Sequence, residues 1–302
     1  MHGSLAAKLE RLLPGRVSFG EPLKLHTTWR IGGPADFFVE PRGTEELVRA
    51  LAFAREESLP VTVIGGGSNL LVKDGGIRGL VIKIGGGFSR LEISGERVVA
   101  EAGVRLARLT GAALEAGVGG FEFLTGIPGT VGGAVVMNAG AFGRAAGDLC
   151  ESVRLLDEDG RLKTLSRREL FFGYRTSSLQ GKNAVVVEAA FRGALREPAA
   201  IRADMEAVQK RRWATQPSGY PSAGSVFKNP PGTSAGFLIE QAGAKGLRCG
   251  GAAVSPVHAN FIVNLGGATA RDVLDLISKV KTVVKQRFAV ELELEVQVLG
   301  ED

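Results

Sequence analysis

The chain has 302 residues, 44% of them hydrophobic and 23% charged, which is enough for two or three domains with proper cores. Two cysteines, Cys150 and Cys249, are too few for a disulfide framework or a Cys-rich metal site, and the three histidines lack metal-ligand spacing. No apolar run approaches the roughly twenty residues of a membrane span and no secretory signal is recognisable, so we expect a cytoplasmic protein with no metal and no membrane partner.

The formal net charge is +5 and the isoelectric point is about 9.4. Such a charge can indicate nucleic-acid binding, but the lysines and arginines are spread along the chain and aromatic residues make up only 6% of it. A mildly basic surface equally suits an enzyme with an anionic, phosphate-bearing substrate. We therefore expect no nucleic-acid partner, and no obligate protein partner is evident.

The N-terminal two thirds of the chain have the pattern of an α+β domain. Residues 44–57 are amphipathic, with Thr44 as a candidate N-cap, which predicts a helix leading into a strand at Val61. A second helix is expected over residues 106–116, ending at Gly117. The other predicted elements are short strands at residues 80–84, 98–102, 153–156 and 184–191.

A domain boundary is expected at residues 193–198, where the strands stop and Pro198 can begin a helix that runs to about residue 213. After a loop-like stretch the pattern predicts a second, smaller α+β domain. Its expected elements are a short helix at residues 237–242, a strand at 260–264 and a long helix from an N-cap at Thr269 to about residue 288.

Residues 290–298 alternate strictly between apolar and polar side chains, with Glu291, Glu293 and Glu295 on the polar face. This pattern predicts a strand, and we expect it to join a sheet in the N-terminal region. The predicted domains are residues 1–62 completed by residues 290–302, residues 63–193, and residues 198–289.

The strand at Val61 ends in the loop Gly65-Gly-Gly-Ser-Asn69. Glycines let successive backbone N–H groups converge on one anion because no Cβ blocks the approach, and Ser68 and Asn69 can add side-chain contacts. A second run, Gly126-Ile-Pro-Gly-Thr-Val-Gly-Gly133, is similarly rich in glycine. Two such loops predict a ligand with several phosphate or polar groups, and the alternative is tight turns between buried strands.

Neither loop has the pattern of the two commonest nucleotide-binding motifs. The Walker sequence occurs nowhere in the chain, and after Gly67 the sequence continues into another strand and not into a helix. A Rossmann domain is therefore disfavoured.

Seven short strings occur in the same order as in the UDP-N-acetylenolpyruvoylglucosamine reductases (MurB) of bacterial peptidoglycan synthesis. Each glycine string alone is weak, but seven in order are specific. The chain resembles this family from about residue 26 to the C-terminus. The strings are Thr28-Trp-Arg-Ile-Gly-Gly33, Gly65-Gly-Gly-Ser-Asn69, Gly126-Ile-Pro-Gly-Thr-Val-Gly-Gly133 with Asn138-Ala-Gly140, Tyr174-Arg175, Ser222-Ala-Gly-Ser-Val-Phe-Lys-Asn-Pro230, His258-Ala-Asn-Phe261 and Glu295-Val296.

The resemblance implies a flavoprotein whose FAD sits in an α+β domain of the vanillyl-alcohol-oxidase type, with a smaller α+β domain for the substrate. It implies that NADPH reduces the flavin, which then reduces the enolpyruvyl group of UDP-N-acetylglucosamine enolpyruvate to give UDP-N-acetylmuramate. No His or Cys lies in either glycine loop, so we expect the FAD to be bound non-covalently. The implied FAD-binding residues are Gly65, Gly66, Gly67, Ser68, Asn69, Gly126, Gly129, Thr130, Gly132 and Gly133.

Hydride addition to an enolpyruvyl double bond moves negative charge onto the adjacent carboxylate, so the site needs a fixed cation there and a proton donor at the neighbouring carbon. Arg175 suits the first need, because a guanidinium can bind a carboxylate through two hydrogen bonds. By resemblance, Ser225 is the proton donor and Glu295 helps to polarise the carboxylate. The alternatives are a surface ion pair for Arg175, a turn role for Ser225 and a solvated strand edge for Glu295.

Three further residues are implied as substrate contacts, namely Tyr174, Lys228 and Asn229. For Lys228 and Asn229 the alternative is loop capping. His258 is expected to be a hydrogen-bonded structural residue beside the site and not a general base.

The resemblance is to the compact branch of the family. The larger branch carries an inserted loop with a tyrosine, and no tyrosine lies between Arg175 and Pro217 here. Two other functions stay open. One is an FAD oxidoreductase of the same cofactor fold that acts on an alcohol or hydroxy acid, and the other is a non-catalytic nucleotide-sugar or RNA-binding protein, which the basic isoelectric point would suit.

Overall fold

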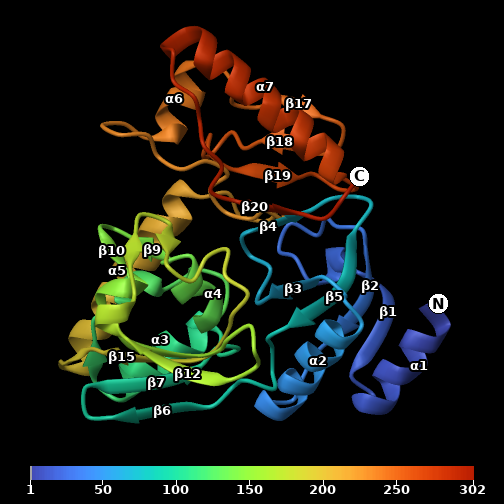
Figure 1. Ribbon diagram of the computed structural model, residues 1–302. Coiled ribbons are helices and arrows are strands. Elements are labelled where there is room, and N and C mark those ends of the chain that lie inside the picture. Colours follow the sequence, from blue (N-terminus) through green and yellow to red (C-terminus); the bar gives the residue numbers. More distant parts are fainter. Residues whose placement is uncertain (1) are drawn as a thin grey trace. The chain divides into compact units, whose positions relative to one another are not determined.

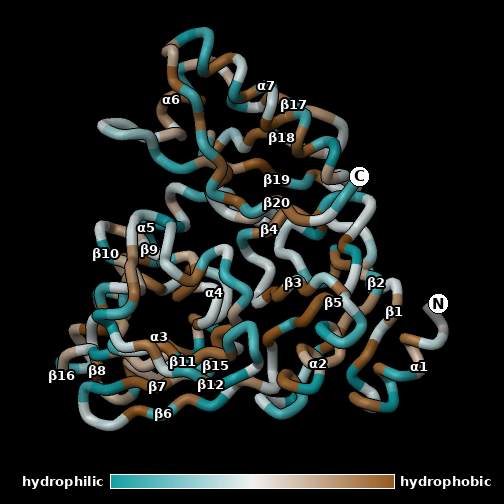
Figure 2. The backbone as a smooth tube through the Cα atoms, in the orientation of Figure 1, coloured by the Kyte–Doolittle hydropathy of each residue, from teal (hydrophilic) through white to brown (hydrophobic). Residues whose placement is uncertain are grey.

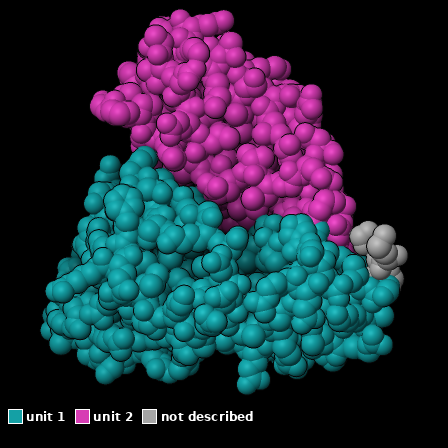
Figure 3. All heavy atoms as spheres, viewed as in Figure 1, with its two compact units in different colours: residues 1–19, 37–66, 79–211 teal, residues 20–36, 67–78, 212–302 magenta. Residues whose placement is uncertain are grey.

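Figure 1 shows the computed structural model, which describes residues 2–302. The chain forms two compact units, coloured separately in Figure 3, and each unit gathers segments that are distant in the sequence. Unit 1 comprises the residues up to Phe19, Phe37–Gly66 and Gly79–Arg211. Unit 2 comprises Gly20–Asp36, Gly67–Arg78 and Arg212–Asp302.

Unit 1 is built on two sheets, the first of which has four strands in the order β1-β2-β5-β3. β3 and β5 are parallel, with Ile64 opposite Lys83, so their carboxyl ends lie at the same edge of the sheet. Most of β5 is buried, as expected for a strand covered on both faces, and Figure 2 shows its apolar residues in brown. The strands are β1 (Val17–Pro22), β2 (Pro34–Val39), β3 (Val61–Ile64) and β5 (Ile77–Lys83).

The second sheet has five strands in the order β12-β11-β15-β7-β6, and all of its pairings are antiparallel. The short helix α4 (Val131–Val136) packs against β7 and β15, which places the second glycine run beside this sheet. The strands are β6 (Leu91–Ser94), β7 (Arg97–Glu101), β11 (Cys150–Leu156), β12 (Leu162–Ser166) and β15 (Val185–Arg192).

Helices complete the single hydrophobic core of unit 1. In α2 the spacing of Leu47, Ala50 and Phe53 puts their side chains on one face, and all three are buried. α3 ends as predicted at Gly117, whose φ of 66° is the left-handed conformation that favours glycine. The helices are α1 (His2–Leu12), α2 (Thr44–Glu56) and α3 (Leu106–Glu115).

Unit 2 has a three-stranded antiparallel sheet, β17-β18-β19, with helix α7 packed against it. The N-terminus of α7 is capped as predicted, because the Thr269 hydroxyl accepts from the Asp272 N–H at 3.0 Å. β20 pairs in parallel with β4 of the same unit. The elements are β4 (Leu70–Val72), α6 (Ala235–Gln241), β17 (Arg248–Cys249), β18 (Ala252–Val254), β19 (Ile262–Asn264), α7 (Ala270–Phe288) and β20 (Gln297–Leu299).

The remaining elements are short, apart from α5 (Pro198–Thr215), which begins at Pro198 as predicted. None of the helices in the described part of the chain is long and apolar enough to cross a membrane. The short strands are β8 (Val118–Gly119), β9 (Gly140–Ala141), β10 (Arg144–Ala145), β13 (Phe172–Gly173), β14 (Thr176–Ser177) and β16 (Ala194–Leu195), and the 3-10 turns are Leu23–Leu25, Glu122–Leu124, Ala146–Asp148 and Arg167–Glu169.

The two units differ from the predicted domains in residues 20–36, 67–78 and 290–302, which belong to unit 2, and in residues 198–211, which belong to unit 1, so that the boundary lies within α5 and not at residues 193–198. The cause is burial against residues far away in the sequence. Trp29 is fully buried in the core of unit 2, and its Nε1 donates to the carbonyl of Ile262 at 3.0 Å. Leu71 is buried in the same core.

Residues 290–298 do not form the continuous strand that their alternation predicts. Only the end of this segment is a strand, β20, and it pairs with β4 of unit 2 and not with residues 1–62. Before β20 the chain pairs at one position, where Leu294 lies opposite Phe227. The alternation instead reflects burial, because Leu292 and Val296 are only 2% exposed.

Candidate active site

The start of the first predicted glycine loop, Gly65 and Gly66, lies against the second loop within unit 1. A Cβ added to Gly65 would come 2.7 Å from the Thr130 hydroxyl oxygen, and one added to Gly66 would come 3.0 Å from the Cα of Gly129. A side chain at either position would therefore push the loops apart. Glycine is needed here because the two backbones approach closely, and this approach lets both loops contact one ligand.

Several polar groups in or next to the two loops lack hydrogen-bond partners in the described residues. Thr130 is 7% exposed, and its Oγ1 has no hydrogen-bond partner among the described residues. The same holds for the hydroxyl of Thr125, which precedes the second loop. No backbone hydrogen bond among residues 2–302 uses the N–H groups of Gly65 and Gly66. Buried polar groups are nearly always paired, so the unpaired hydroxyl of the buried Thr130, next to the half-buried Gly65 and the exposed Gly66, has the character of part of an anion site.

The rest of the first loop belongs to unit 2. Gly67 has a φ of 63°, and a Cβ there would lie 1.9 Å from the carbonyl oxygen of His26, so only glycine fits. Ser68 is half-buried. The side chain of Asn69 donates from Nδ2 to the carbonyl of Glu295 at 3.0 Å, which ties the loop to the predicted catalytic glutamate.

The other glycines of the second loop have two different roles. Gly126 and Gly129 have φ values of 75° and 127°, where other residues are strained. Gly132 is buried, and its missing Cβ would lie 2.9 Å from the side chain of Ala102, so it allows α4 to pack on the sheet. Gly133 is exposed in α4.

Tyr174 and Arg175 form the turn of a small hairpin in unit 1, in which β13 pairs with β14. Arg175 has a φ of 55°, which is uncommon for a residue other than glycine. Its guanidinium carbon lies 5.4 Å from the centre of the Tyr174 ring. Tyr174 is 53% exposed and Arg175 is half-buried, so both side chains are presented at the tip of the turn.

Two amide side chains that were not predicted as site residues hold this hairpin. Asn138 donates from Nδ2 to the carbonyl of Gly173 at 2.7 Å and accepts from the Gly147 N–H at 2.8 Å. Gln180 donates to the carbonyl of Arg175 at 3.1 Å. The sequence does hint at a role for Asn138, because a side-chain amide that follows a buried apolar run needs hydrogen-bond partners. The sequence does not identify those partners.

The structure brings Ser225 and Glu295 together in unit 2. Ser225 pairs with Phe261 on one side of its segment, and Phe227 pairs with Leu294 on the other. The backbone N–H of Glu295 donates to the carbonyl of Val226 at 2.8 Å. The two predicted residues therefore belong to one hydrogen-bonded arrangement, although they are far apart in the sequence.

Lys228 and Asn229 continue the same segment. The N–H of Lys228 donates to the carbonyl of Glu293 at 2.9 Å, and its Nζ lies 3.5 Å from the Glu293 carboxylate. The Oδ1 of Asn229 accepts from the N–H of Ala235 at 3.0 Å. Asn229 therefore has the loop-capping contact that was the alternative to a substrate contact.

Asn260 lies at the centre of this arrangement and is 3% exposed. Its side chain binds the backbone of Phe227, and its carbonyl accepts from the Val226 N–H at 2.8 Å. The neighbouring His258 accepts from the Asn260 N–H through Nδ1 at 3.2 Å, and burial holds the pKa of His258 below its ordinary value of 6.5. His258 is thus a hydrogen-bonded structural residue, as expected.

Two families of known proteins match the chain. Residues 35–166 match an FAD binding domain, and they include the approach of the two glycine loops. Residues 216–299 match the C-terminal domain of UDP-N-acetylenolpyruvoylglucosamine reductase, and they include Ser225 and Glu295.

Relatives match over the whole length of the chain. The UDP-N-acetylenolpyruvoylglucosamine reductase of Desulforamulus reducens is 49% identical over 302 residues, which is 100% of both chains. That of Moorella thermoacetica is 50% identical over 298 residues, covering 99% of this chain and 98% of the relative. The crystal structure of UDP-N-acetylenolpyruvylglucosamine reductase (MurB) from Thermus caldophilus superimposes with a TM-score of 0.82 at 40% identity, covering 94% of this chain and 98% of that one.

These matches confirm the predicted fold class as an α+β protein with an FAD-binding domain and a separate C-terminal domain. The site fits FAD on its own geometry as well. The unpaired hydroxyl of Thr130 and the free N–H groups of Gly65 and Gly66 are donors of the kind that a pyrophosphate accepts. Within residues 2–302, no group of three or more His, Cys, Asp or Glu side chains is placed to hold a metal ion.

Proposed function

Because the chain belongs to the UDP-N-acetylenolpyruvoylglucosamine reductase family, we propose that it uses NADPH to reduce the enolpyruvyl group of UDP-N-acetylglucosamine enolpyruvate. The product is UDP-N-acetylmuramate, a precursor of peptidoglycan, and the reaction takes place in the cytoplasm. The observation that carries the assignment is the hydrogen bond between the Glu295 N–H and the Val226 carbonyl, since it keeps Glu295 beside Ser225.

We assign the two glycine loops to the binding of FAD. FAD, when bound, supplies the acceptor for hydride from NADPH and the donor of hydride to the substrate. The N–H groups of Gly65 and Gly66 and the hydroxyl of Thr130 would hold its pyrophosphate. The binding is non-covalent, because neither loop carries a His or Cys.

Ser225 and Glu295 act on the carbon skeleton of the substrate. Once hydride has added to one carbon of the double bond, the adjacent carbon needs a proton, and the Ser225 hydroxyl donates it. Glu295 is half-buried, and its carboxyl group stabilises the charge that develops on the substrate carboxylate.

Arg175 binds the substrate carboxylate. Arg175 lies at the tip of a turn. Gln180 donates a hydrogen bond to its backbone carbonyl, and Asn138 donates one to the carbonyl of Gly173 in the same hairpin, which supports a fixed position for the guanidinium. A guanidinium offers two parallel N–H donors to a carboxylate and keeps its charge at any physiological pH. Tyr174 and Lys228 are further contacts with the UDP-sugar, whereas the Oδ1 of Asn229 is engaged in the loop-capping hydrogen bond from the Ala235 N–H.

The test is a measurement of NADPH oxidation by the purified protein with UDP-N-acetylglucosamine enolpyruvate, followed by mass spectrometry of the product. We expect one NADPH to be consumed for each UDP-N-acetylmuramate formed. Oxidation of alcohols or hydroxy acids with consumption of oxygen, and no reduction of the UDP-sugar, would assign the chain to a different flavoenzyme. A protein that purifies without flavin and binds none would rule out the proposal.

A further inference from the structure

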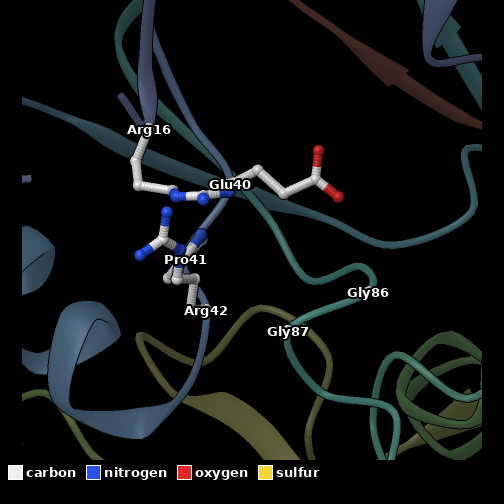
Figure 4. Close-up of a pocket in the computed structure, with 6 residues that line it drawn as sticks. All are labelled: Arg16, Glu40, Pro41, Arg42, Gly86 and Gly87. Carbon is white, nitrogen blue, oxygen red and sulfur yellow. The ribbon is translucent and has the colours of Figure 1, made fainter. Parts of the chain in front are cut away.

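Unit 1 contains a cavity of about 340 Å³ (Figure 4), and all six residues that line it belong to that unit. Two of the groups proposed to react with the substrate, Ser225 and Glu295, belong to unit 2. The residues that hold these two groups in place are also in unit 2, just before Trp29 and just before β4. The residues lining the cavity are Arg16, Glu40, Pro41, Arg42, Gly86 and Gly87.

Thr28 holds the chain just before Ser225. Its hydroxyl donates to the carbonyl of Ser222 at 2.8 Å, although the two residues are 194 positions apart. Between Ser222 and Ser225 the chain passes through Gly224, which has a φ of 77°, and no atom lies within 4 Å of where its Cβ would be. Because glycine has the greatest conformational freedom of any residue, this segment needs a contact on each side of the glycine. Thr28 supplies the contact before it, and Asn260 supplies the contact after it.

Asn69 holds the chain at Glu295. The Nδ2 of Asn69 donates to the carbonyl of Glu295 at 3.0 Å, and the carbonyl of Asn69 accepts from the Gln297 N–H at 2.9 Å. The N–H of Glu295 donates to the carbonyl of Val226. Both backbone groups of Glu295 are therefore paired, one with the segment that carries Ser225 and the other with Asn69.

The first glycine loop joins these two contacts. The N–H of Thr28 donates to the carbonyl of Gly67 at 3.1 Å, and Gly67 lies two residues before Asn69. A Cβ on Gly67 would overlap the carbonyl oxygen of His26, so the loop and the turn before Trp29 are packed without space between them. The loop, the segment of Ser225 and the segment of Glu295 thus form one hydrogen-bonded arrangement within unit 2.

We propose that Thr28 and Asn69 are positioning residues for the protonation step, through which the first glycine loop fixes Ser225 and Glu295. The inference rests on the proposed function, because it takes Ser225 as the proton donor and this loop as part of the FAD site. Hydride and proton are added to neighbouring carbons, so their donors must be held at a fixed separation. A displacement of about 1 Å can cost about 10² in rate. A loop that binds the cofactor and also holds both reacting residues keeps that separation constant.

The test begins with Thr28→Val, which keeps the shape of the side chain and removes its hydroxyl. Stopped-flow traces of the FAD-loaded protein should show flavin reduction by NADPH at nearly the parent rate. Reoxidation by UDP-N-acetylglucosamine enolpyruvate should slow by about tenfold to a hundredfold. Thr28→Ser, which retains a hydroxyl, should recover most of the parent rate.

Thr27→Val is the matched control. The Thr27 hydroxyl is buried beside Thr28, but it donates to the carbonyl of Ile31 at 2.8 Å and therefore stays within its own turn. We expect Thr27→Val to lose stability and to reoxidise its flavin at nearly the parent rate. Equal slowing of reoxidation in Thr27→Val and Thr28→Val would overturn the inference, since it would show a general effect of damage to this turn.

A solvent isotope effect distinguishes positioning from folding. Where the proton donor is misplaced, proton transfer limits reoxidation, so the ratio of the rates in H₂O and D₂O should be larger in Thr28→Val and in Asn69→Ala than in the parent. A loss of stability alone leaves this ratio unchanged. Asn69→Ala also provides the test if Thr28→Val does not fold.

Hydrogen exchange in the flavin-free protein gives a readout that does not depend on activity. Exchange should become faster over residues 222–228 in Thr28→Val and over residues 293–298 in Asn69→Ala, because each variant removes a contact of that segment. Thr27→Val should leave both segments at the parent rate.

The possible failures are distinguishable. A parent protein whose reduced flavin is not reoxidised by the UDP-sugar fails the proposed function itself. If the parent reacts but Thr28→Val and Asn69→Ala reoxidise at the parent rate, or slow both half-reactions equally with an unchanged isotope effect, only the positioning role is overturned.

Discussion

The side-chain amide of Asn260 binds both backbone groups of Phe227, accepting from its N–H at 2.9 Å and donating to its carbonyl at 2.8 Å. Phe227 lies two residues from Ser225 and opposite Leu294, the neighbour of Glu295. One buried amide therefore fixes the segment that relates the proposed proton donor to the proposed carboxyl group.

Asn260→Ala should lose both stability and turnover. Removing the amide leaves the Phe227 N–H and carbonyl unpaired in a buried site, which costs about 1–3 kcal/mol of the free energy of unfolding. Displacement of the segment should lower kcat by about tenfold to a hundredfold, since small shifts of reacting groups are costly. Urea unfolding and steady-state kinetics measure the two effects.

Asn264→Ala is the matched control for this change. Asn264 is also buried in unit 2, where it donates to the Trp29 carbonyl at 3.1 Å and accepts from the N–H groups of Gly266 and Ala268. We expect a similar loss of stability with a much smaller loss of kcat. Equal losses of kcat in the two variants would mean that Asn260 matters only for folding.

Glu295 should differ from the other glutamates of its segment. It is half-buried, whereas Glu291 and Glu293 are exposed. Glu295→Gln should fold, bind FAD and be reduced by NADPH, yet lose about 10²–10³ in turnover, as is typical for one group that stabilises transition-state charge. Glu291→Gln and Glu293→Gln should turn over like the parent. Equal turnover in all three variants would show that the carboxyl group of Glu295 has no special role in the reaction.

The two thiols should react at very different rates. Burial raises the pKa of Cys150 to about 11, and the nearby charge of Arg167 opposes this only in part. At pH 8 about one molecule in a thousand would carry the reactive thiolate at Cys150. A thiol reagent should therefore modify Cys249 in the native protein and both cysteines in denaturant. Two fast equivalents in the native protein would contradict the burial of Cys150.

Stability should fall in mildly acidic solution because of His258. Burial lowers the pKa of His258 below 6.5, with a smaller contribution from Lys245 and opposition from Glu240. Between that lowered pKa and 6.5 the unfolded chain binds a proton that the folded chain does not, so the free energy of unfolding decreases as the pH falls below 6.5. His258→Gln, which cannot titrate, should show a flatter dependence in this window. An unchanged slope would assign the effect to other groups.

Local patterns predicted the helices well, because a helix is specified by residues close to each other in the sequence. α3, α5 and α7 begin and end within two residues of their expected limits, and the cap at Thr269 is as predicted. The helix α2 begins at Thr44, but Gly43 and not Thr44 occupies the N-cap position. The membership of Trp29 and Leu71 in unit 2 could not be predicted, since it depends on partners more than a hundred residues away.

In the candidate site, too, local patterns could be recognised from the sequence, whereas contacts between distant residues could not. The glycine loops and the segment of Ser225 were identified through ordered strings that resemble a family, whereas the roles of Asn138 and Asn260 were missed. Both amides bind backbone groups, and backbone groups leave no trace in the sequence. The alternation that predicted a strand up to residue 298 recorded burial of Leu292 and Val296, which an irregular extended segment satisfies equally well.

The most direct test of the account is stopped-flow measurement of the two half-reactions of the Ser225→Ala variant. The proton from Ser225 is needed only when the enolpyruvyl group is reduced, so flavin reduction by NADPH should proceed at nearly the parent rate. Reoxidation of the reduced flavin by UDP-N-acetylglucosamine enolpyruvate should slow by about 10²–10⁴, the usual contribution of general acid catalysis. Equal slowing of both half-reactions, or reoxidation at the parent rate, would contradict the assignment of Ser225 as the proton donor.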